Sequence, residues 1–267
     1  MLAFFHWMLY NPTKNTIMLV NISIMKKKVK KLLDKQQIEL LEGFSTREAK
    51  IVLLEQAKKG WLCPKVQKKL FSMPNGMEIL IIQAQNGPIS AYVQMLLFDY
   101  PNGLKVLMKQ AERGELHTKL QRKICSLPNA SKFLLAQSRK GQLDFDTLRK
   151  AMDLSDGSEI TLEQAKKGHL FHEDIQMKAC SLPNADEIML EEAKNGYIYS
   201  DKVLLKACEL SNAEEIIQAQ ATKHALRDCV QIKAMDFRCG REIMVAQMRL
   251  GSLCSEAQRK AISLGYI

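Results

Sequence analysis

EQAKKGHLFHEDIQMKACSLPNA, residues Glu163 to Ala185, is one copy of a unit that recurs along most of the chain. The last residue of its Gln-Ala-Lys-Lys-Gly box has counterparts at Gly60, Gly87, Gly114, Gly141, Gly168, Gly196, His224 and Gly251. The spacings between them are 27, 27, 27, 27, 28, 28 and 27 residues. Such a regular period is typical of a solenoid, because one short unit cannot bury its apolar face alone.

Each copy contains two breaks that separate two runs. Two residues after the glycine position comes an aliphatic residue, which is Leu62, Ile89, Leu116, Leu143, Leu170, Ile198, Leu226 or Leu253. The second break reads MPN at Met73, YPN at Tyr100, LPN at Leu127 and Leu182, LSD at Leu154 and LSN at Leu210. Each unit is therefore expected to hold two short elements joined by turns.

The run before each glycine has apolar residues at helical spacing, for example Ile188, Met189, Leu190 and Ala193. It begins at Asn or Asp with Glu three residues later, as in Asn75/Glu78, Asp156/Glu159, Asn184/Glu187 and Asn212/Glu215. We expect the Asn or Asp side chain to accept hydrogen bonds from first-turn amides. We expect the glycine to adopt the left-handed conformation past the helix end. The pattern predicts a first helix of about 11 residues.

The run after each glycine predicts a second helix. It opens with a small or polar residue such as Asp144 or Ser200, and it carries apolar residues such as Ile175 and Ala179. Proline cannot continue a helix, so we expect a helix of about 10 residues that ends at the proline position. Two short antiparallel helices per unit predict an all-α fold, an α-solenoid of about eight helix-turn-helix repeats of 27–28 residues.

The composition favours an intracellular protein. The 267-residue chain has a net charge of +10, and six lysines against one aspartate between Lys26 and Lys35 supply half of it. Lys14 adds one charge, and the remaining +4 is spread over residues 36–267, which is a weaker excess than the basic face of an obligate nucleic-acid-binding domain. The seven cysteines include no CxxC pair and mostly occupy repeat positions as small apolar residues. We therefore expect free thiols and a cytoplasmic location.

The N-terminal region precedes the repeats. Residues 1–25 hold two apolar runs, each too short for a membrane-spanning helix, and no positive charge precedes the first run as it would in a secretory signal. We interpret them as an apolar extension; if Met18 or Met25 is the true start, the residues before it are not part of the native protein. Residues 26–45 predict a basic amphipathic capping helix, whose Lys26–Lys31 cluster would also suit a nuclear localisation signal or contact with anionic lipid.

The solenoid is expected to occupy residues 46–267. Its last helix, Ser255 to Ser263, has a polar side that would cap the stack, formed by Glu256, Gln258, Arg259 and Lys260.

Neither a metal site nor an active site is expected. His169, His172 and Cys180 are the only tempting metal ligands, but they straddle a turn and lack a fourth ligand. The chain has no glycine-rich phosphate loop, no GxSxG motif and no paired carboxylates that depart from the repeat. The sequence of an enzyme built from repeats usually departs from the repeat pattern at the active site, and no such departure is found here. We therefore predict that the protein is not an enzyme and uses no metal or cofactor.

A glutamine column lies four residues before the glycine position. It consists of Gln56, Gln83, Gln110, Gln137, Gln164, Glu192, Gln220 and Gln247. The column follows an apolar position by one helical turn, hence it lies on the packed side of the first helix, where an amide must find partners. We interpret it as a structural ladder that hydrogen-bonds to a neighbouring unit's turn. The alternative is a polar line that a concave face presents to an extended ligand.

A basic column lies five residues before the proline position. It consists of Lys69, Lys123, Lys150, Lys178, Lys206, Lys233 and Lys260, and Leu96 takes this position in one repeat. Lysine in the last turn of a helix is favoured by the helix dipole alone. The alternative is a track of one cation per repeat that suits phosphates or an acidic protein.

The residue directly after the glycine position varies most. It is Trp61, Pro88, Glu115, Gln142, His169, Tyr197, Ala225 or Ser252. An unconstrained turn would vary in this way, and so would an edge that contacts a partner. The candidate partner-binding residues are Trp61, Glu115, Gln142, His169 and Tyr197.

The chain resembles the helical-hairpin arrays, such as HEAT and tetratricopeptide proteins, although its 27-residue period is shorter than theirs. The resemblance implies an extended concave surface used for binding. We therefore expect a non-enzymatic scaffold that recognises a protein or peptide partner. The alternative is a nucleic-acid-binding solenoid in which one lysine per repeat contacts phosphates.

Overall fold

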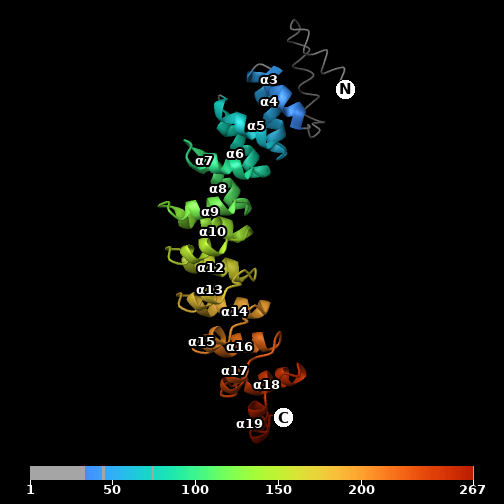
Figure 1. Ribbon diagram of the computed structural model, residues 1–267, viewed down its shortest axis with the longest axis vertical. Helices are drawn as coiled ribbons and strands as arrows, with labels where there is room; N and C mark the ends of the chain where they lie inside the picture. Colours follow the sequence, from blue (N-terminus) through green and yellow to red (C-terminus); the bar gives the residue numbers. More distant parts are fainter. Residues whose placement is uncertain (1–33, 44–45, 74, 267) are drawn as a thin grey trace. The chain divides into compact units, whose positions relative to one another are not determined.

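The computed structural model describes residues 34–43, 46–73 and 75–266, and this part of the chain contains helices but no strand (Figure 1). Residues 1–33, with the predicted extension and the first part of the predicted capping helix, lie outside the described residues. The chain divides into two compact units, Met1–Leu120 and Gln121–Ile267. Helical repeats follow one another in each unit, so the predicted α-solenoid is confirmed.

The first unit begins its described part with α3 (Asp34–Gly43). Its remaining elements are α4 (Thr46–Lys58), α5 (Pro64–Lys69), the 3-10 helix η1 (Leu70–Ser72), α6 (Gly76–Asn86), α7 (Ala91–Phe98), α8 (Gly103–Arg113) and the start of α9 (Thr118–Ile124). The first helix of the predicted repeat region, α4, begins at Thr46.

The second unit begins within α9 and consists of regularly alternating longer and shorter helices. They are α10 (Ala130–Lys140), α11 (Phe145–Ala151), α12 (Gly157–Ala165), α13 (Glu173–Ala179), α14 (Ala185–Asn195), α15 (Asp201–Ala207), α16 (Ala213–Ala221), α17 (Asp228–Ala234), α18 (Gly240–Arg249) and α19 (Ser255–Ser263). The last helix has the predicted bounds, and Glu256, Gln258 and Arg259 are exposed on it.

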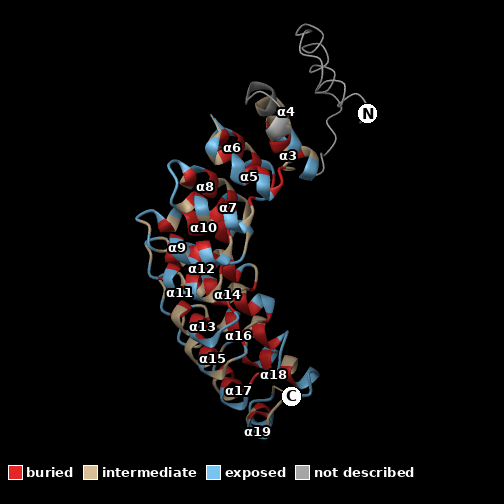
Figure 2. Cartoon of the chain, turned by 45° about the horizontal axis from the view of Figure 1, so that its top comes forward, coloured by how far each residue is buried: buried red, intermediate tan, exposed pale blue. Residues whose placement is uncertain are grey.

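Within each unit, the first helix of a repeat packs on the first helix of the next. In the first unit α4 packs on α6 and α6 on α8; in the second unit α10, α12, α14, α16 and α18 pack in succession. The second helices also pack on one another in succession. In the first unit α3 packs on α5 and α5 on α7, and in the second unit α13 packs on α15, α15 on α17 and α17 on α19. The buried residues accordingly lie where the helices of each unit face their neighbours (Figure 2).

The first helices bury one repeated face. In α14 the buried residues are Ala185, Ile188, Met189, Glu192 and Ala193, spaced i, i+3, i+4, i+7 and i+8 as one face of an α-helix requires. The same spacing is found in α6, α8 and α10. Each fully buried Ile or Leu stabilises the fold by about 1.5–3 kcal/mol, so this face holds successive repeats together.

The second helices are shorter than predicted. Most of them have seven residues, for example α13 and α15, because the chain leaves the helix at Ala179 and Ala207 and continues in a turn before the Leu-Pro-Asn or Leu-Ser-Asn break. The N–H of Leu182 donates to Ala179 and the N–H of Ala185 donates to Leu182, so two successive turns replace the predicted last helical turn.

The predicted side-chain caps at the start of the first helices are wrong. The side chains of Asn75, Asp156, Asn184 and Asn212 accept no capping hydrogen bond. The amides of Asn184 and Asn212 instead donate to the carbonyls of Ser158 and Asp186, which belong to the preceding repeat. The neighbouring repeat thus competes with the helix for the cap side chain.

The left-handed glycine is found in most repeats but not in all. Gly60, Gly114, Gly168, Gly196 and Gly251 have positive φ. Gly87 has φ −163°, an extended conformation favoured by Pro88 after it. Gly141 is also extended, with φ −117°.

Candidate functional site

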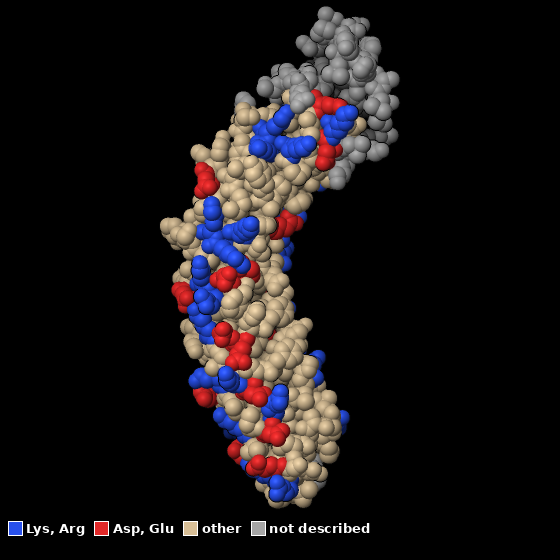
Figure 3. All heavy atoms as spheres, viewed as in Figure 1, with Lys and Arg blue, Asp and Glu red and all other residues tan. Residues whose placement is uncertain are grey.

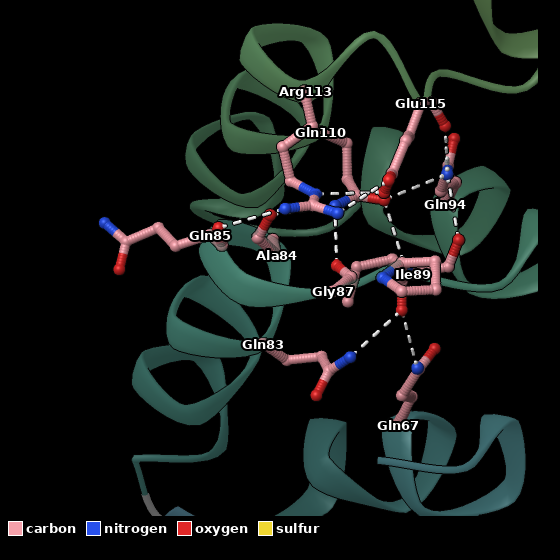
Figure 4. A network of polar contacts seen from close by, with 11 residues as sticks. Gln67, Gln83, Ala84, Gln85, Gly87, Ile89, Gln94, Gln110, Arg113 and Glu115 are labelled. Atoms are coloured by element: carbon pink, nitrogen blue, oxygen red, sulfur yellow. Dashed lines mark hydrogen bonds and ion pairs between the residues drawn. The ribbon is translucent and has the colours of Figure 1, made fainter. Parts of the chain in front are cut away.

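The turn between the paired helices is held by the glutamine of the next repeat. In the first unit, Oε1 of Gln110 accepts the N–H of Ile89 at 2.8 Å, and Nε2 donates to the carbonyls of Ala84 and Gly87 at 2.9 and 3.1 Å (Figure 4). In the second unit, Gln164 binds Leu143, Ser138 and Gly141 in the same way.

The whole glutamine column is inaccessible to a ligand. All its members are buried, namely Gln56, Gln83, Gln110, Gln137, Gln164, Glu192, Gln220 and Gln247. Gln83 accepts the N–H of Leu62, and Gln247 accepts the N–H of Leu226. Because these side chains lie between repeats and bind turn backbone, they position the turns and present no polar line at the surface.

A second glutamine column, on the second helices, holds the same turns from the preceding repeat. Nε2 of Gln94 donates to the carbonyls of Ile89 and Glu115, both at 2.9 Å (Figure 4). Its Oε1 accepts the N–H of His117. The corresponding residues are Gln67, Gln121, Gln176 and Gln231, which are also buried. Leu148 and Leu204 take this position in two repeats. The turn after Gly87, for example, thus lies between the amide side chains of Gln67 and Gln110.

The helix α3 takes part in this pattern. Nε2 of Gln37 donates to the carbonyl of Trp61 at 2.8 Å, and its Oε1 accepts the N–H of Cys63 at 2.9 Å. These are the bonds that Gln94 makes with the next turn. The described part of the predicted capping helix therefore packs as the second helix of a repeat would.

The five candidate partner-binding residues differ in their surroundings. Trp61 and Glu115 are half-buried in the first unit, where Glu115 forms an ion pair with Arg113 at 2.7 Å (Figure 4). Gln142 is exposed in the second unit. His169 and Tyr197 are half-buried there, and both rings contact Phe171.

His169 and Tyr197 belong to a row of rings on three successive turns of the second unit. We call His169, Phe171, Tyr197, Tyr199 and His224 the aromatic row. The centroid distances between successive rings are 5.8, 5.9, 6.3 and 5.5 Å. Phe171 and Tyr199 are 54% and 64% exposed. The rings meet edge to face or tilted, as aromatic pairs prefer.

Two members of the aromatic row rest on glycines of the preceding turn. A Cβ added to Gly168 would clash with the ring of Tyr197, and one added to Gly196 would lie 2.7 Å from Nε2 of His224. Each glycine therefore leaves room for the next repeat's ring. His224 itself stands at the glycine position of its own repeat, so the loss of that glycine supplies the last ring of the row.

The charges beside the aromatic row are mostly neutralised. Ion pairs join Lys166 to Glu163, Lys194 to Glu191, Lys202 to Glu173 and Arg227 to Asp201, at 3.1, 2.8, 3.5 and 3.7 Å. Lys167 donates to the carbonyl of Ser138. Burial, followed by the charge of Lys167, lowers the pKa of His169, so its imidazole is neutral at pH 7.

The basic column is partly neutralised as well. Lys178 pairs with Asp153 at 2.6 Å, Lys260 with Asp236 at 3.0 Å, and Lys206 with Glu209 in its own repeat. Lys69, Lys123 and Lys150 are exposed, and Lys233 is partly exposed. On the face drawn in Figure 3, acidic side chains lie among the basic ones.

Neither the histidines nor the cysteines gather into a reactive cluster in the described residues. No group of three His, Cys, Asp or Glu that could hold a metal ion is found among them. The ring of His172 contacts Phe145 at 4.4 Å, and all seven cysteines are free thiols. Burial raises the pKa of Cys180 to about 11, which disfavours the reactive thiolate.

Glu192 is the one acidic member of the glutamine column. Its side chain is fully buried, and its Oε1 accepts the N–H of Leu170 at 3.2 Å. Its Oε2 is buried and has no hydrogen-bond partner in the described part of the chain. Burial raises the pKa of Glu192 to about 8. The carboxyl group is therefore largely protonated at neutral pH and resembles the amide that it replaces.

Comparisons with protein-family models, with curated proteins and with solved structures found no match to this chain. None of the helices in the described residues combines the length and the apolar character that crossing a membrane requires.

Sequence reasoning missed the exposed rings and the second glutamine column, although both leave a signal. Phe171 and Tyr199 each lie three residues after the glycine of their repeat. Gln67 and Gln94 each lie seven residues after theirs. An alignment of every repeat position, rather than of the most constant ones, would have found both.

Proposed function

We propose that the protein is a non-enzymatic scaffold that binds a protein or peptide partner along the turns of its helical repeats. The observation that carries this proposal is the aromatic row, with Phe171 and Tyr199 more than half exposed. Grouped exposed aromatic side chains are typical of interaction sites, where they supply most of the binding energy.

The constant positions of the repeat support this proposal because their side chains are buried and stabilise the fold, so they are not available to a partner. Both glutamine columns bind turn backbone, and Cys63 and Cys180 are buried thiols. The variable turn residues are left to contact a partner. Free thiols throughout the chain favour a reducing, cytoplasmic location, which we include in the proposal.

Nucleic-acid binding through the basic column is the alternative. The ion pairs of Lys178, Lys206 and Lys260 weigh against it, because each carboxylate offsets charge that phosphates would need. A salt titration tests it: phosphate contacts would make affinity for an oligonucleotide fall steeply with salt, and Ala at Lys123, Lys150 and Lys178 would flatten the slope.

Selection of random displayed peptides on the immobilised full-length chain tests the scaffold. Calorimetry on a selected peptide would compare the parent with the double variant Phe171→Ser, Tyr199→Ser. We expect affinity to fall about tenfold or more, since truncating an interface aromatic commonly costs over ~1 kcal/mol. Tyr92→Ser is the matched control, because Tyr92 is 57% exposed in the other unit. Selection of no peptide, or equal binding by the double variant, would overturn the proposal.

A further inference from the structure

We propose that the aromatic row binds a neutral, proline-rich segment in the extended polyproline II conformation. This inference rests on the proposed function, because it names the class of peptide that the scaffold binds.

The row presents one largely exposed ring per repeat. Phe171 and Tyr199 stand at equivalent positions of successive repeats, and the helices α13, α15 and α17 behind them pack one on the next. Packed helices lie about 8–10 Å apart. A polyproline II helix has three residues per turn and advances ~9 Å per turn. Every third residue of such a ligand would therefore meet one ring.

Other ligand conformations fit this spacing less well. An α-helix advances only ~5.4 Å per turn. A strand repeats its side-chain direction every ~7 Å. Both would drift out of register with one ring per repeat. Polyproline II segments are also a common ligand of surfaces lined by aromatic side chains.

The charges favour a neutral ligand. The cations of four ion pairs beside the row, at Lys166, Lys194, Lys202 and Arg227, already have carboxylate partners. Lys223 is exposed and has no ion pair in the described residues. One such lysine is too little for a phosphate backbone, which needs a cation for each phosphate contacted. Because most of the charged side chains beside the row are already paired, few remain to bind a strongly acidic or basic peptide.

The turns hold the rings in place before a ligand arrives. The carbonyl of Tyr197 accepts from Nε2 of Gln176 at 2.8 Å, and that of Ile198 accepts from Nε2 of Gln220 at 3.0 Å. The ring of Tyr197 is further confined against Gly168. A proline-rich segment is rigid as well, so binding would cost little conformational entropy in either the protein or the peptide. Its backbone carbonyls have no internal partners, and tyrosine hydroxyls can donate to them.

Calorimetry with a nonaproline peptide with blocked ends, on the full-length protein, tests this inference. We expect it to bind, and a glycine-serine peptide of equal length to bind far more weakly. Affinity should fall about tenfold or more in Phe171→Ser, Tyr199→Ser and remain unchanged in Tyr92→Ser. Far-UV circular dichroism checks folding, and the single variant Tyr199→Ser, at a 64% exposed position, provides a milder second test.

The outcomes separate this inference from the proposed function. If peptides selected from the random library bind through the row but lack proline, and nonaproline does not bind, the inference fails and the scaffold stands. Nonaproline binding that is unchanged in both row variants would also overturn the inference. If an oligouridylate binds with a steep salt dependence while no peptide binds, both proposals fall.

Discussion

Oε1 of Glu192 accepts the backbone N–H of Leu170 at 3.2 Å, in the place where Gln164 accepts the N–H of Leu143 at 2.9 Å. The two side chains differ in their second polar atom. Nε2 of Gln164 donates to two carbonyls of the preceding turn, whereas Oε2 of Glu192 has no partner in the described residues. Only a protonated carboxyl group could donate in the manner of the amide.

Replacing Glu192 by Gln should therefore stabilise the protein at neutral and alkaline pH. Burial raises the pKa of Glu192 from 4.5 to about 8. Below pH 4.5 the group is protonated in the folded and unfolded states alike. As pH rises towards 8, the unfolded chain loses the proton first, so the free energy of unfolding falls. The total decrease that corresponds to the pKa difference is about 5 kcal/mol.

Urea unfolding followed by circular dichroism at pH 5 and pH 8 would measure this effect. Glu192→Gln should gain stability over the parent as pH increases, and the exposed Glu187→Gln on the same helix is the control. An equal difference between Glu192→Gln and the parent at both pH values would show that the carboxyl group does not titrate on unfolding as argued.

Gln110→Leu should destabilise the first unit. The change leaves the buried N–H of Ile89 and the carbonyls of Ala84 and Gly87 without their partner. Each unsatisfied buried group costs about 1–3 kcal/mol, so we expect a loss of several kcal/mol. Gln258→Leu is the control, because Gln258 is exposed and makes no side-chain hydrogen bond within the described residues. Comparable losses in chemical denaturation for the two variants would contradict the role of the column.

Gly168→Ala should cost more stability than Gly251→Ala. Both glycines have nearly the same left-handed conformation, with φ +65° and +66°, so both changes carry a similar backbone strain of about 1–2 kcal/mol. A Cβ at Gly168 would also clash with the ring of Tyr197, whereas one at Gly251 would meet nothing within 4 Å. The difference in their thermal or urea unfolding measures the close approach of successive turns. Equal stability of the two variants would show that the ring of Tyr197 moves away from the added methyl group without cost.

Cys229 should be the thiol that alkylates fastest in the folded protein. It is exposed, whereas Cys180 is buried and its pKa is raised to about 11 by burial. Brief treatment with iodoacetamide at pH 8, followed by mass spectrometry of peptides, should find the label at Cys229 and little at Cys180. Equal labelling in urea provides the control for intrinsic reactivity. Rapid labelling of Cys180 in the folded state would mean that its helix opens readily.

Much of this architecture could be read from the order of residues. The regular glycine, the aliphatic residue after it and the Pro-Asn break predict paired helices, because the 3.6-residue helical period and the backbone limits of Gly and Pro act over a few residues. Local chemistry failed where a neighbouring repeat competes for the same group. Asn184 and Asn212 donate to the preceding repeat and do not cap their own helices.

The sequence alone determined the repeat, the helix pairs and the buried side of Gln110 and Gln164, since each depends on periodicity along the chain. Only the tertiary structure decided what those side chains touch. It brought Phe171 against Tyr197 and Tyr199 against His224, which lie 26 and 25 residues apart in the chain, because stacking places equivalent turns of successive repeats side by side. Contacts between repeats depend on how the helices pack, and no local propensity encodes that packing.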